Sequence, residues 1–252
     1  MRAGIFITAR LKSTRLPMKI IKDIMGKPMI VHMLDRLKLS NRIDLIVINT
    51  SVNPQDNVLE DIAVREKVQC FRGNEEDVLL RMYDAALHYG VDTVISCTAD
   101  NPFVDPEYID KLLDYHLSQN NDYTKINGLP FGTFSYALKV DAIGKALKIK
   151  DTFDTEVWGA YFTETGLFKT GSLEVEDKFL RRPTLRLTVD YQDDFDFICK
   201  IFDGLYEKER IFTLKEILQY LDNHPELFKI NMHITQKAAS PIKIKKEAEN
   251  IK

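Results

Sequence analysis

Hydrophobic residues in the first half of the chain follow two alternating patterns. Short apolar, β-branched runs that are hydrophobic on both faces predict buried parallel strands, and apolar residues spaced three and four apart predict helices between them. These patterns predict strands at residues 2–8, 44–50, 69–71 and 92–97 and helices at residues 29–39, 53–66, 78–89 and 106–119. Strands that alternate with helices predict an α/β fold with a doubly wound, mostly parallel sheet.

The pattern changes in the second half. Strand-like runs follow one another at residues 122–126, 134–139 and 167–174. They predict a mixed or antiparallel excursion, and we place an inserted substrate lobe at residues 122–182. A strand at residues 185–189 is expected to return to the sheet, followed by helices at residues 192–208 and 213–223.

Bulk composition narrows the class of protein. The chain has 252 residues, 44% hydrophobic and 29% charged, which suits one domain over residues 1–240 with a charged tail at 241–252. A net charge of −3 argues against a protein that coats nucleic acid, because such proteins neutralise many phosphates with clustered Lys and Arg. No run of about 18 apolar residues could span a bilayer, so we expect a cytoplasmic protein without a membrane partner. The three cysteines form no CxxC pair, which predicts reduced core thiols.

A basic loop, ARLKSTRLPMK at residues 9–19, follows the first predicted strand. Its polar side chains are Arg10, Lys12, Ser13, Thr14, Arg15 and Lys19. Open α/β sheets bind ligands at the carboxyl ends of their strands, and a strand-to-helix loop presents free backbone N–H groups there. Guanidinium and ammonium groups add partners for a polyphosphate. The glycine-rich phosphate motifs GxxxxGK[ST] and GxGxxG are absent. Composition alone would equally allow a solvated basic loop, and the position at the strand end favours a phosphate site.

Two aspartates follow predicted strands at the same edge of the sheet. Asp100 lies in TADNPFVDP after the strand at residues 92–97, and Asp190 lies in LRLTVDYQDDFDFI after the strand at residues 185–189. A single aspartate at a strand end is usually a helix or turn cap. A pair of carboxylates at neighbouring strand ends also suits Mg²⁺, because phosphate oxygens and water complete its octahedron.

The basic loop and the MGKPMIVHMLDRLK that follows resemble the opening of the sugar-acid cytidylyltransferases, which make CMP-Kdo and CMP-sialic acids. The resemblance is closer still to the SpsF-like cytidylyltransferases of spore-coat polysaccharide synthesis. It implies a nucleotide-diphospho-sugar transferase-like, Rossmann-like fold, usually a homodimer. It also implies that CMP passes from CTP to an acidic sugar, a sugar phosphate or a polyol phosphate, with release of pyrophosphate.

The resemblance also assigns roles to residues. Arg10 and Lys19 match the family's phosphate-binding Arg and Lys, and with Asp100 they form the predicted catalytic set. Asp100 and Asp190 match the aspartates that hold Mg²⁺ on the nucleotide. The other predicted nucleotide-site residues are Ser13 and Arg15 from the loop, Arg72 from a match to FRGxEEDVLxR, and Thr8, Ala9, Thr50 and Ser51 from their positions at strand ends.

The acceptor side departs from the family pattern. SpsF-like relatives read close to E-x-E-H-V-T, whereas this chain has DTEVW at residues 154–158, so Glu156 and Trp158 replace the usual His and Thr. These two residues and Arg182, which could pair with an acidic acceptor, are the predicted acceptor site. Trp158 could equally belong to the core, and Arg182 could be part of a surface basic pair with Arg181.

Two other classes of protein stay open. A GT-A glycosyltransferase shares this type of sheet, but such enzymes typically carry a DxD metal motif, and here Asn101 and Pro102 follow Asp100. A non-catalytic nucleotide-binding protein would also be consistent with the altered acceptor segment.

Overall fold

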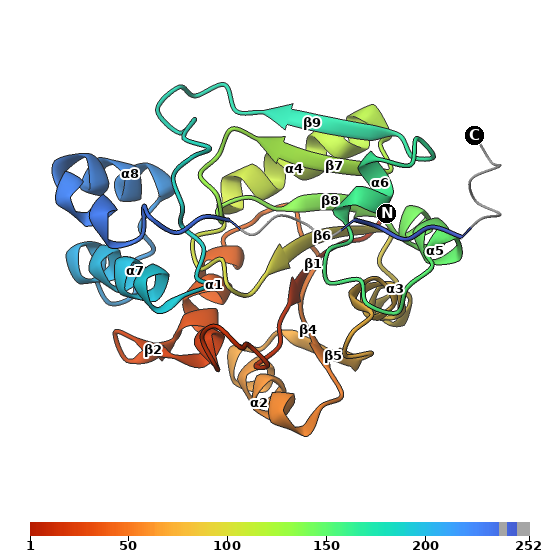
Figure 1. The fold of residues 1–252 in the computed structure, drawn as a ribbon, viewed down its shortest axis with the longest axis horizontal. Helices are drawn as coiled ribbons and strands as arrows, with labels where there is room; N and C mark the ends of the chain where they lie inside the picture. The colour runs from red at the N-terminus through yellow and green to blue at the C-terminus, as the bar shows by residue number, and fades with distance from the viewer. Residues whose placement is uncertain (237–240, 246–252) are drawn as a thin grey trace.

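A seven-stranded sheet forms the centre of the computed structural model, which describes residues 1–236 and 241–245. The strand order is β5-β4-β1-β6-β8-β7-β9, and β8 alone is antiparallel to its neighbours. In Figure 1 the strands are stacked from β9 at the top to β5 at the bottom. The strands of this sheet are β1 (Ala3–Thr8), β4 (Leu45–Ser51), β5 (Gln69–Gly73), β6 (Thr93–Thr98), β7 (Tyr123–Asn127), β8 (Tyr136–Lys139) and β9 (Thr170–Glu174). A small ribbon, β2 (Asp23–Ile24) with β3 (Lys27–Pro28), precedes the first helix. The predicted mostly parallel α/β fold is confirmed.

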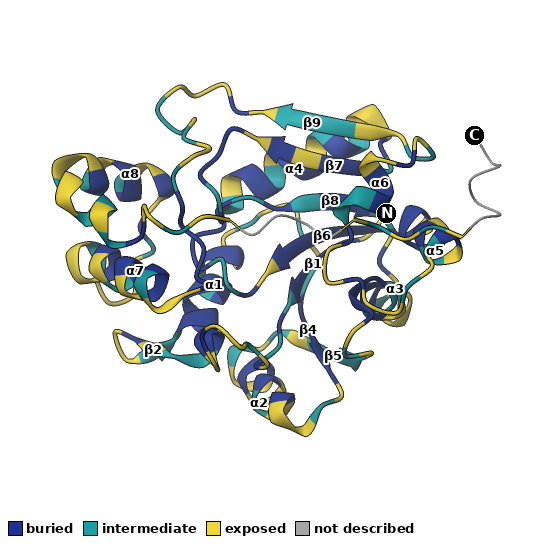
Figure 2. Cartoon of the chain, viewed as in Figure 1, coloured by how far each residue is buried: buried dark blue, intermediate teal, exposed yellow. Residues whose placement is uncertain are grey.

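Helices cover both faces of the sheet (Figure 1). Alternate residues of β1 serve two separate cores: Ile5 and Ile7 pack with α1, α2, α4, α7 and α8, whereas Phe6 packs with α3, α5 and α6. Figure 2 shows the central strands buried and the outer strand β9 largely intermediate or exposed. The helices are α1 (Met29–Leu37), α2 (Asn57–Glu66), α3 (Val78–Tyr89), α4 (Pro106–Gln119), α5 (Val140–Ile149), α6 (Gly159–Thr163), α7 (Gln192–Leu205) and α8 (Leu214–Asn223), with short 3₁₀ turns η1 (Lys19–Ile21), η2 (Pro54–Asp56) and η3 (Pro225–Ile230).

The strand order reverses beside β1. The chain builds outward from β1 to β4 and β5, and then returns to place β6 on the other side of β1. Loops that leave adjacent strands in opposite directions open a crevice at their carboxyl ends. The fold therefore puts the loop after β1 and the loop after β6 on either side of the expected ligand crevice.

The predicted strand at residues 185–189 is wrong. Among the described residues, this segment is not a strand of the sheet. It forms a single isolated β-bridge, between Arg186 and Phe131. Its backbone bonds to two loops instead, since Leu187 N donates to Phe131 O and Val189 N donates to Asp100 O. Its apolar residues are buried under loops, and burial alone gave the strand-like pattern. The segment nevertheless carries Asp190 to the carboxyl edge of β6.

The segment expected to form a lobe contributes β7, β8 and β9 to the central sheet. It also contains α5 and α6, which the hydrophobic pattern did not predict. The division into one domain with a substrate lobe at residues 122–182 stays a prediction. In the tail, Ile244 bridges to Lys150 and Lys245 N donates to Ile149 O, while residues 246–252 lie outside the described residues.

Two further expectations concern the described residues. Cys70, Cys97 and Cys199 are free. Cys97 is buried, as the prediction of core thiols expects, whereas Cys70 and Cys199 are only partly buried. Within residues 1–236 and 241–245 none of the helices has the length and apolar character needed to cross a membrane.

The buried His116 makes the stability of the folded protein depend on pH. Its ring is fully buried on α4, with Nδ1 2.8 Å from Thr124 Oγ1 and with no hydrogen-bond partner for Nε2. Burial, helped by Lys139, lowers the pKa of His116 to about 4. An unfolded histidine titrates near pH 6.5, so below that pH the unfolded state binds the proton more readily. The stability held by neutral His116 is complete above about pH 6.5 and is lost as the pH falls toward 4.

We expect this residue to remove about 3 kcal/mol from the free energy of unfolding between pH 6.5 and pH 4. Urea unfolding of the wild type and of His116→Asn at pH 7.5, 5.5 and 4.5 measures the effect, because carboxylates titrate alike in both proteins. The wild type should lose stability more steeply than the variant, and parallel losses would show that His116 is not the group responsible.

Candidate active site

The predicted metal carboxylates meet at one lysine. Lys19 begins η1, at the end of the loop after β1, and Met18 before it turns the chain with a φ of 54°. The Lys19 Nζ donates to Asp100 Oδ2 at 2.9 Å, to Asp190 Oδ1 at 3.1 Å and to Val189 O at 2.6 Å. The Lys19 side chain is only 10% exposed. Three segments from distant parts of the sequence therefore converge on a single buried ammonium group.

Two arginines complete this group, which we call the Lys19 cluster: Lys19, Asp100, Asp190, Arg15 and Arg186. Arg15 Nη2 lies 2.7 Å from Asp190 Oδ1, and Arg186 Nη2 lies 3.0 Å from Asp190 Oδ2. Arg186 also binds both carboxylate oxygens of Asp194. Burial would raise the pKa of Asp190, but Lys19, Arg186 and Arg15 lower it below its ordinary value. Burial would lower the pKa of Lys19, but Asp100 and Asp190 raise it. Both groups are therefore charged at neutral pH.

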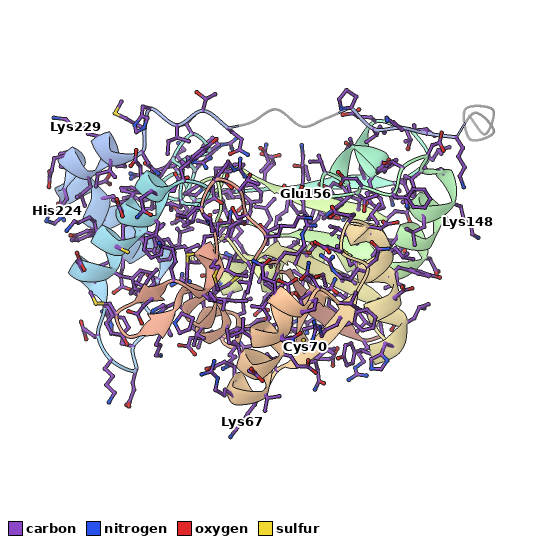
Figure 3. The ribbon with its side chains drawn as sticks, turned by 60° about the horizontal axis from the view of Figure 1, so that its bottom comes forward. Lys67, Cys70, Lys148, Glu156, His224 and Lys229 are labelled. Atoms are coloured by element: carbon purple, nitrogen blue, oxygen red, sulfur yellow. The ribbon has the colours of Figure 1, made fainter. Side chains whose placement is uncertain are left out.

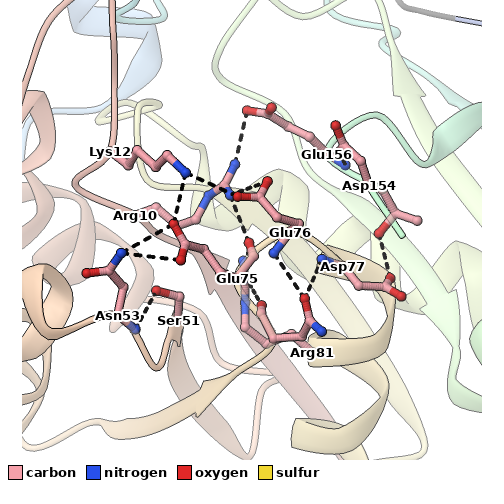
Figure 4. A network of polar contacts seen from close by, with 12 residues as sticks. Arg10, Lys12, Ser51, Asn53, Glu75, Glu76, Asp77, Arg81, Asp154 and Glu156 are labelled. Atoms are coloured by element: carbon pink, nitrogen blue, oxygen red, sulfur yellow. Dashed lines mark hydrogen bonds and ion pairs between the residues drawn. The ribbon is translucent and has the colours of Figure 1, made fainter. Parts of the chain in front are cut away.

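A second group lies at the beginning of the same loop and is called the Arg10 cluster: Arg10, Lys12, Glu75, Glu76 and Glu156 (Figure 4). Arg10 Nη1 donates to Glu75 O at 2.8 Å and lies 3.4 Å from Glu76 Oε2, and Arg10 Nη2 lies 3.5 Å from Glu156 Oε1. Lys12 Nζ lies 3.2 Å from a carboxylate oxygen of each of Glu75 and Glu76. These hydrogen bonds and charges raise the pKa of Lys12, and hydrogen bonds from Asn53 and Lys12 lower the pKa of Glu75. Glutamate carboxylates thus pair with Arg10 and Lys12, two cations of the loop that the sequence predicts to bind phosphates.

The remaining predicted nucleotide residues line the carboxyl ends of β1, β4 and β5. Ser51 is buried, and its Oγ donates to Asp56 Oδ2 at 2.5 Å. Arg72 donates to Ser51 O at 3.1 Å and to Asn53 O at 3.0 Å, so both residues hold the turn after β4. The hydroxyls of Thr8 and Thr50 are buried without a hydrogen-bond partner among the described residues. Ala9 is buried and its N–H donates to Asn49 O, whereas Ser13 Oγ accepts from Leu16 N.

Two residues near this edge were missed by the sequence reasoning. Asn49 on β4 is the register partner of Thr8, and its buried amide has no partner within the described chain. Arg81 on α3 is fully buried and donates to Asn74 O and Glu75 O, but its Nε and Nη2 lack partners there. Burial lowers the pKa of Arg81 to about 10, and the nearby Arg10 adds to the effect. A polar residue inside an apolar strand and the final Arg of FRGNEEDVLLR were the available signals. Leaving a buried polar group unpaired costs about 1–3 kcal/mol, so such groups are candidates for ligand contacts.

The three predicted acceptor residues lie in different surroundings. Glu156 belongs to the Arg10 cluster, and Figure 3 shows it over the middle of the molecule, far from His224 and Lys229. Trp158 is buried and packs edge-on against Tyr136, as the core interpretation expects. Arg182 forms a bidentate pair with Asp222 on α8, at 2.5 and 2.7 Å. The structure therefore brings only Glu156 of the three to the basic loop.

The carboxylate pair suits a divalent cation carried by a nucleotide. No group of three or more His, Cys, Asp or Glu side chains able to hold a metal occurs among the described residues. Magnesium sites on nucleotides need only one or two protein carboxylates, because phosphates and water supply the other ligands. Both carboxylate oxygens of Asp190 are paired, whereas the Asp100 side chain is 25% exposed and, among the described residues, its carboxylate accepts only from Lys19, so Asp100 is the carboxylate more open to such a cation. The donor set therefore fits a cation that arrives with a polyphosphate.

Comparison with known proteins points to one family. The cytidylyltransferase family model matches residues 4–232. The chain is 33% identical over 237 residues to protein MJ1063 of Methanocaldococcus jannaschii, covering 92% of this chain and 95% of that protein. It is 29% identical over 227 residues to the spore coat polysaccharide biosynthesis protein SpsF of Bacillus subtilis, covering 87% and 94%. Among solved structures, a cytidylyltransferase from Leptospira borgpetersenii superimposes with a TM-score of 0.83 at 25% identity, covering 94% of this chain and all of that one.

Proposed function

Because this chain belongs to the cytidylyltransferase family, whose members are CTP-dependent nucleotidyltransferases, we propose that it transfers CMP from CTP to a small acidic acceptor. The acceptor is an acidic sugar, a sugar phosphate or a polyol phosphate destined for a surface polysaccharide or glycan. The observation that supports this proposal is the Lys19 cluster, in which a phosphate-loop lysine joins two carboxylates at the switch point of the sheet. The resemblance is the basis for proposing a cytoplasmic homodimer with Mg²⁺ as its cation.

The reaction needs charge placed around a polyphosphate. An acceptor oxygen attacks the α-phosphorus of CTP and forms a new P–O bond, the bond from that phosphorus to the oxygen bridging the α- and β-phosphates breaks, and pyrophosphate leaves. A hydroxyl acceptor releases its proton to solvent, and a phosphate acceptor attacks through an oxygen that carries none. Lys19 and Arg15 from one end of the loop, and Arg10 and Lys12 from the other, surround the triphosphate with four cations. Fixed cations stabilise the charge that builds on the leaving pyrophosphate and hold the reacting atoms in line.

The carboxylates act on the cation and on the loop. Asp100 and Asp190 would hold a divalent cation, which supplies charge neutralisation for the phosphate oxygens when bound. Asp190 also fixes Arg15 and Lys19, because each donates to its Oδ1. Arg186 and Asp194 in turn hold Asp190, since Arg186 binds both carboxylates and Asp190 N donates to Asp194 Oδ2. We assign Arg186 and Asp194 as positioning residues.

A pyrophosphate-release screen tests the proposal. Four nucleoside triphosphates are crossed with sugar acids, sugar phosphates and polyol phosphates, with and without Mg²⁺. We expect pyrophosphate from CTP with one acceptor class, only when the cation is present, and a product whose mass is that of the acceptor plus CMP. Transfer from a sugar nucleotide, with no pyrophosphate from any triphosphate, would instead identify a glycosyltransferase.

A further inference from the structure

The Arg10 cluster contains more carboxylates than cations. Among the described residues, the side chains of Glu75, Glu76 and Glu156 form ion pairs with two cations, Arg10 and Lys12, and Glu75 also accepts from Asn53 (Figure 4). The Arg10 side chain is 13% exposed, whereas that of Glu156 is 71% exposed. Glu156 therefore approaches a partly buried guanidinium from the open side, where a triphosphate would also have to enter.

The backbone that carries Glu156 is braced against the start of α3. Thr155 Oγ1 donates to Asp77 Oδ1 at 2.8 Å and accepts from Leu79 N at 2.9 Å, and Thr155 N donates to Glu76 O at 3.2 Å. Lys150 forms a buried ion pair with the other oxygen of Asp77. Asp77 also caps α3 by accepting from Leu80 N. These contacts fix the backbone next to Glu156, so its side chain starts from a defined position beside Arg10.

A bound triphosphate changes the charge balance at this place. The phosphate oxygens and the Glu156 carboxylate, which lies 3.5 Å from Arg10 Nη2, would compete for the same guanidinium group. Two negative groups beside one guanidinium also repel each other. Once the phosphates hold Arg10 and Lys12, the carboxylates of the cluster lose their cationic partners. The most exposed of them, Glu156, is then left on the open side of the cluster with an unpaired negative charge. An acceptor that carried only negative groups there would add to the repulsion.

We propose that Glu156 selects the acceptor, and that the acceptor is a sugar acid with a free, protonated amino group. This inference rests on the proposed function. CTP displaces Glu156 from Arg10, and the released carboxylate then binds the ammonium group of the acceptor. The same contact makes binding ordered, with the nucleotide first.

The first experiment measures competition for Arg10. Trp158 is the single tryptophan of the chain and lies two residues from Glu156, so its fluorescence can follow titration with the α,β-methylene analogue of CTP and Mg²⁺. We expect Glu156→Gln to bind the analogue about fivefold more tightly than the wild type at low salt, the scale of one exposed ion pair. The matched control is Asp154→Asn, because Asp154 is exposed on the same segment and, within the part of the chain that the structure describes, its carboxylate accepts only from Glu156 N. It should bind as the wild type does.

The outcomes separate the two proposals. A wild type that does not bind the analogue would count against the proposed function itself. A wild type that binds it as tightly as Glu156→Gln would leave the proposed function standing and overturn the inference about Glu156.

The second experiment tests the acceptor class on the protein saturated with the CTP analogue, which prevents turnover. Two probes differ in one group: glucosaminic acid carries an amine where gluconic acid carries a hydroxyl. We expect the wild type and Asp154→Asn to bind glucosaminic acid about tenfold more tightly, and Glu156→Gln to lose this preference. Equal binding of the two acids by the wild type, including no binding of either, would overturn the proposed acceptor class.

Discussion

Replacing Lys19 with methionine is expected to lower kcat/KM for CMP transfer by about 10³-fold, the scale of removing one preorganised charge from a transition state. Lys19 is the only side chain that contacts both Asp100 and Asp190 among the described residues, and it is charged despite its burial. Its removal takes away a cation for the leaving group and leaves the two carboxylates facing each other. Steady-state pyrophosphate release measures the loss.

Structural damage is the competing explanation, and two controls address it. Lys22→Met removes a nearby lysine whose ammonium lies over the Phe195 ring, and it should leave kcat/KM within about twofold. Asp190 keeps Arg15 and Arg186 in the Lys19→Met protein, so the free energy of unfolding should fall by less than about 3 kcal/mol. A Lys19→Met protein that is folded and retains a tenth or more of wild-type activity would show that the ammonium group is structural.

Local signals explain why much of the fold could be predicted. The helices expected at residues 78–89 and 106–119 occur with those bounds, because each begins after an aspartate that caps it. Asp77 accepts from Leu80 N and Asp105 accepts from Tyr108 N. Each helix also ends at a residue in the left-handed conformation, Gly90 and Asn120. Such signals lie within one turn of the helix end, so a sequence pattern contains them fully.

Contacts between distant segments explain what could not be predicted. The segment around Arg186 is as apolar as a strand, and only the tertiary structure decides that loops rather than strands pair with it. The loop cations were recognised, but their carboxylate partners lie 63 or more residues away in the sequence. The resemblance nominated Asp100 and Asp190 separately, and the fold is what joins them through Lys19. The roles of the predicted site residues stay predictions until variants are measured.

The two clusters divide the basic loop into parts with different electrostatics. In the Lys19 cluster, the three cations Lys19, Arg15 and Arg186 surround Asp190, and burial strengthens their interactions. In the Arg10 cluster, solvent-exposed carboxylates surround two cations, so their pairing is weak and can be exchanged. A polyphosphate that spans the loop would therefore find one end fixed and the other exchangeable. Within the Lys19 cluster, the two aspartates also differ in burial, since the Asp190 side chain is 9% exposed and the Asp100 side chain 25%. They should therefore respond differently to replacement.

Asp190→Asn is expected to lower the free energy of unfolding by about 3 kcal/mol, whereas Asp100→Asn should change it by less than about 1 kcal/mol. The Asp190 side chain is 9% exposed and holds three cations, whereas that of Asp100 is 25% exposed and is bonded to Lys19. The pKa of Asp190 is lowered in the folded state, mainly by Lys19 against the opposing effect of burial. Its contribution is therefore present above the unfolded value of about 3.9 and is lost as the pH falls through the folded value.

Unlike stability, activity should fall by a similar factor in Asp100→Asn and Asp190→Asn. Both replacements remove a carboxylate from the proposed cation site, so each should lower kcat/KM by about 10²-fold or more at saturating Mg²⁺. Asp196→Asn on the exposed face of α7, where the side chain accepts from Gln192, is the matched control for both measurements. Asp100 is the sharper test, because a stable Asp100→Asn protein with wild-type turnover and an unchanged Mg²⁺ requirement would remove this carboxylate from the site. A protein that loses turnover without losing stability would instead separate binding of the cation from the folding role that Asp190 also has.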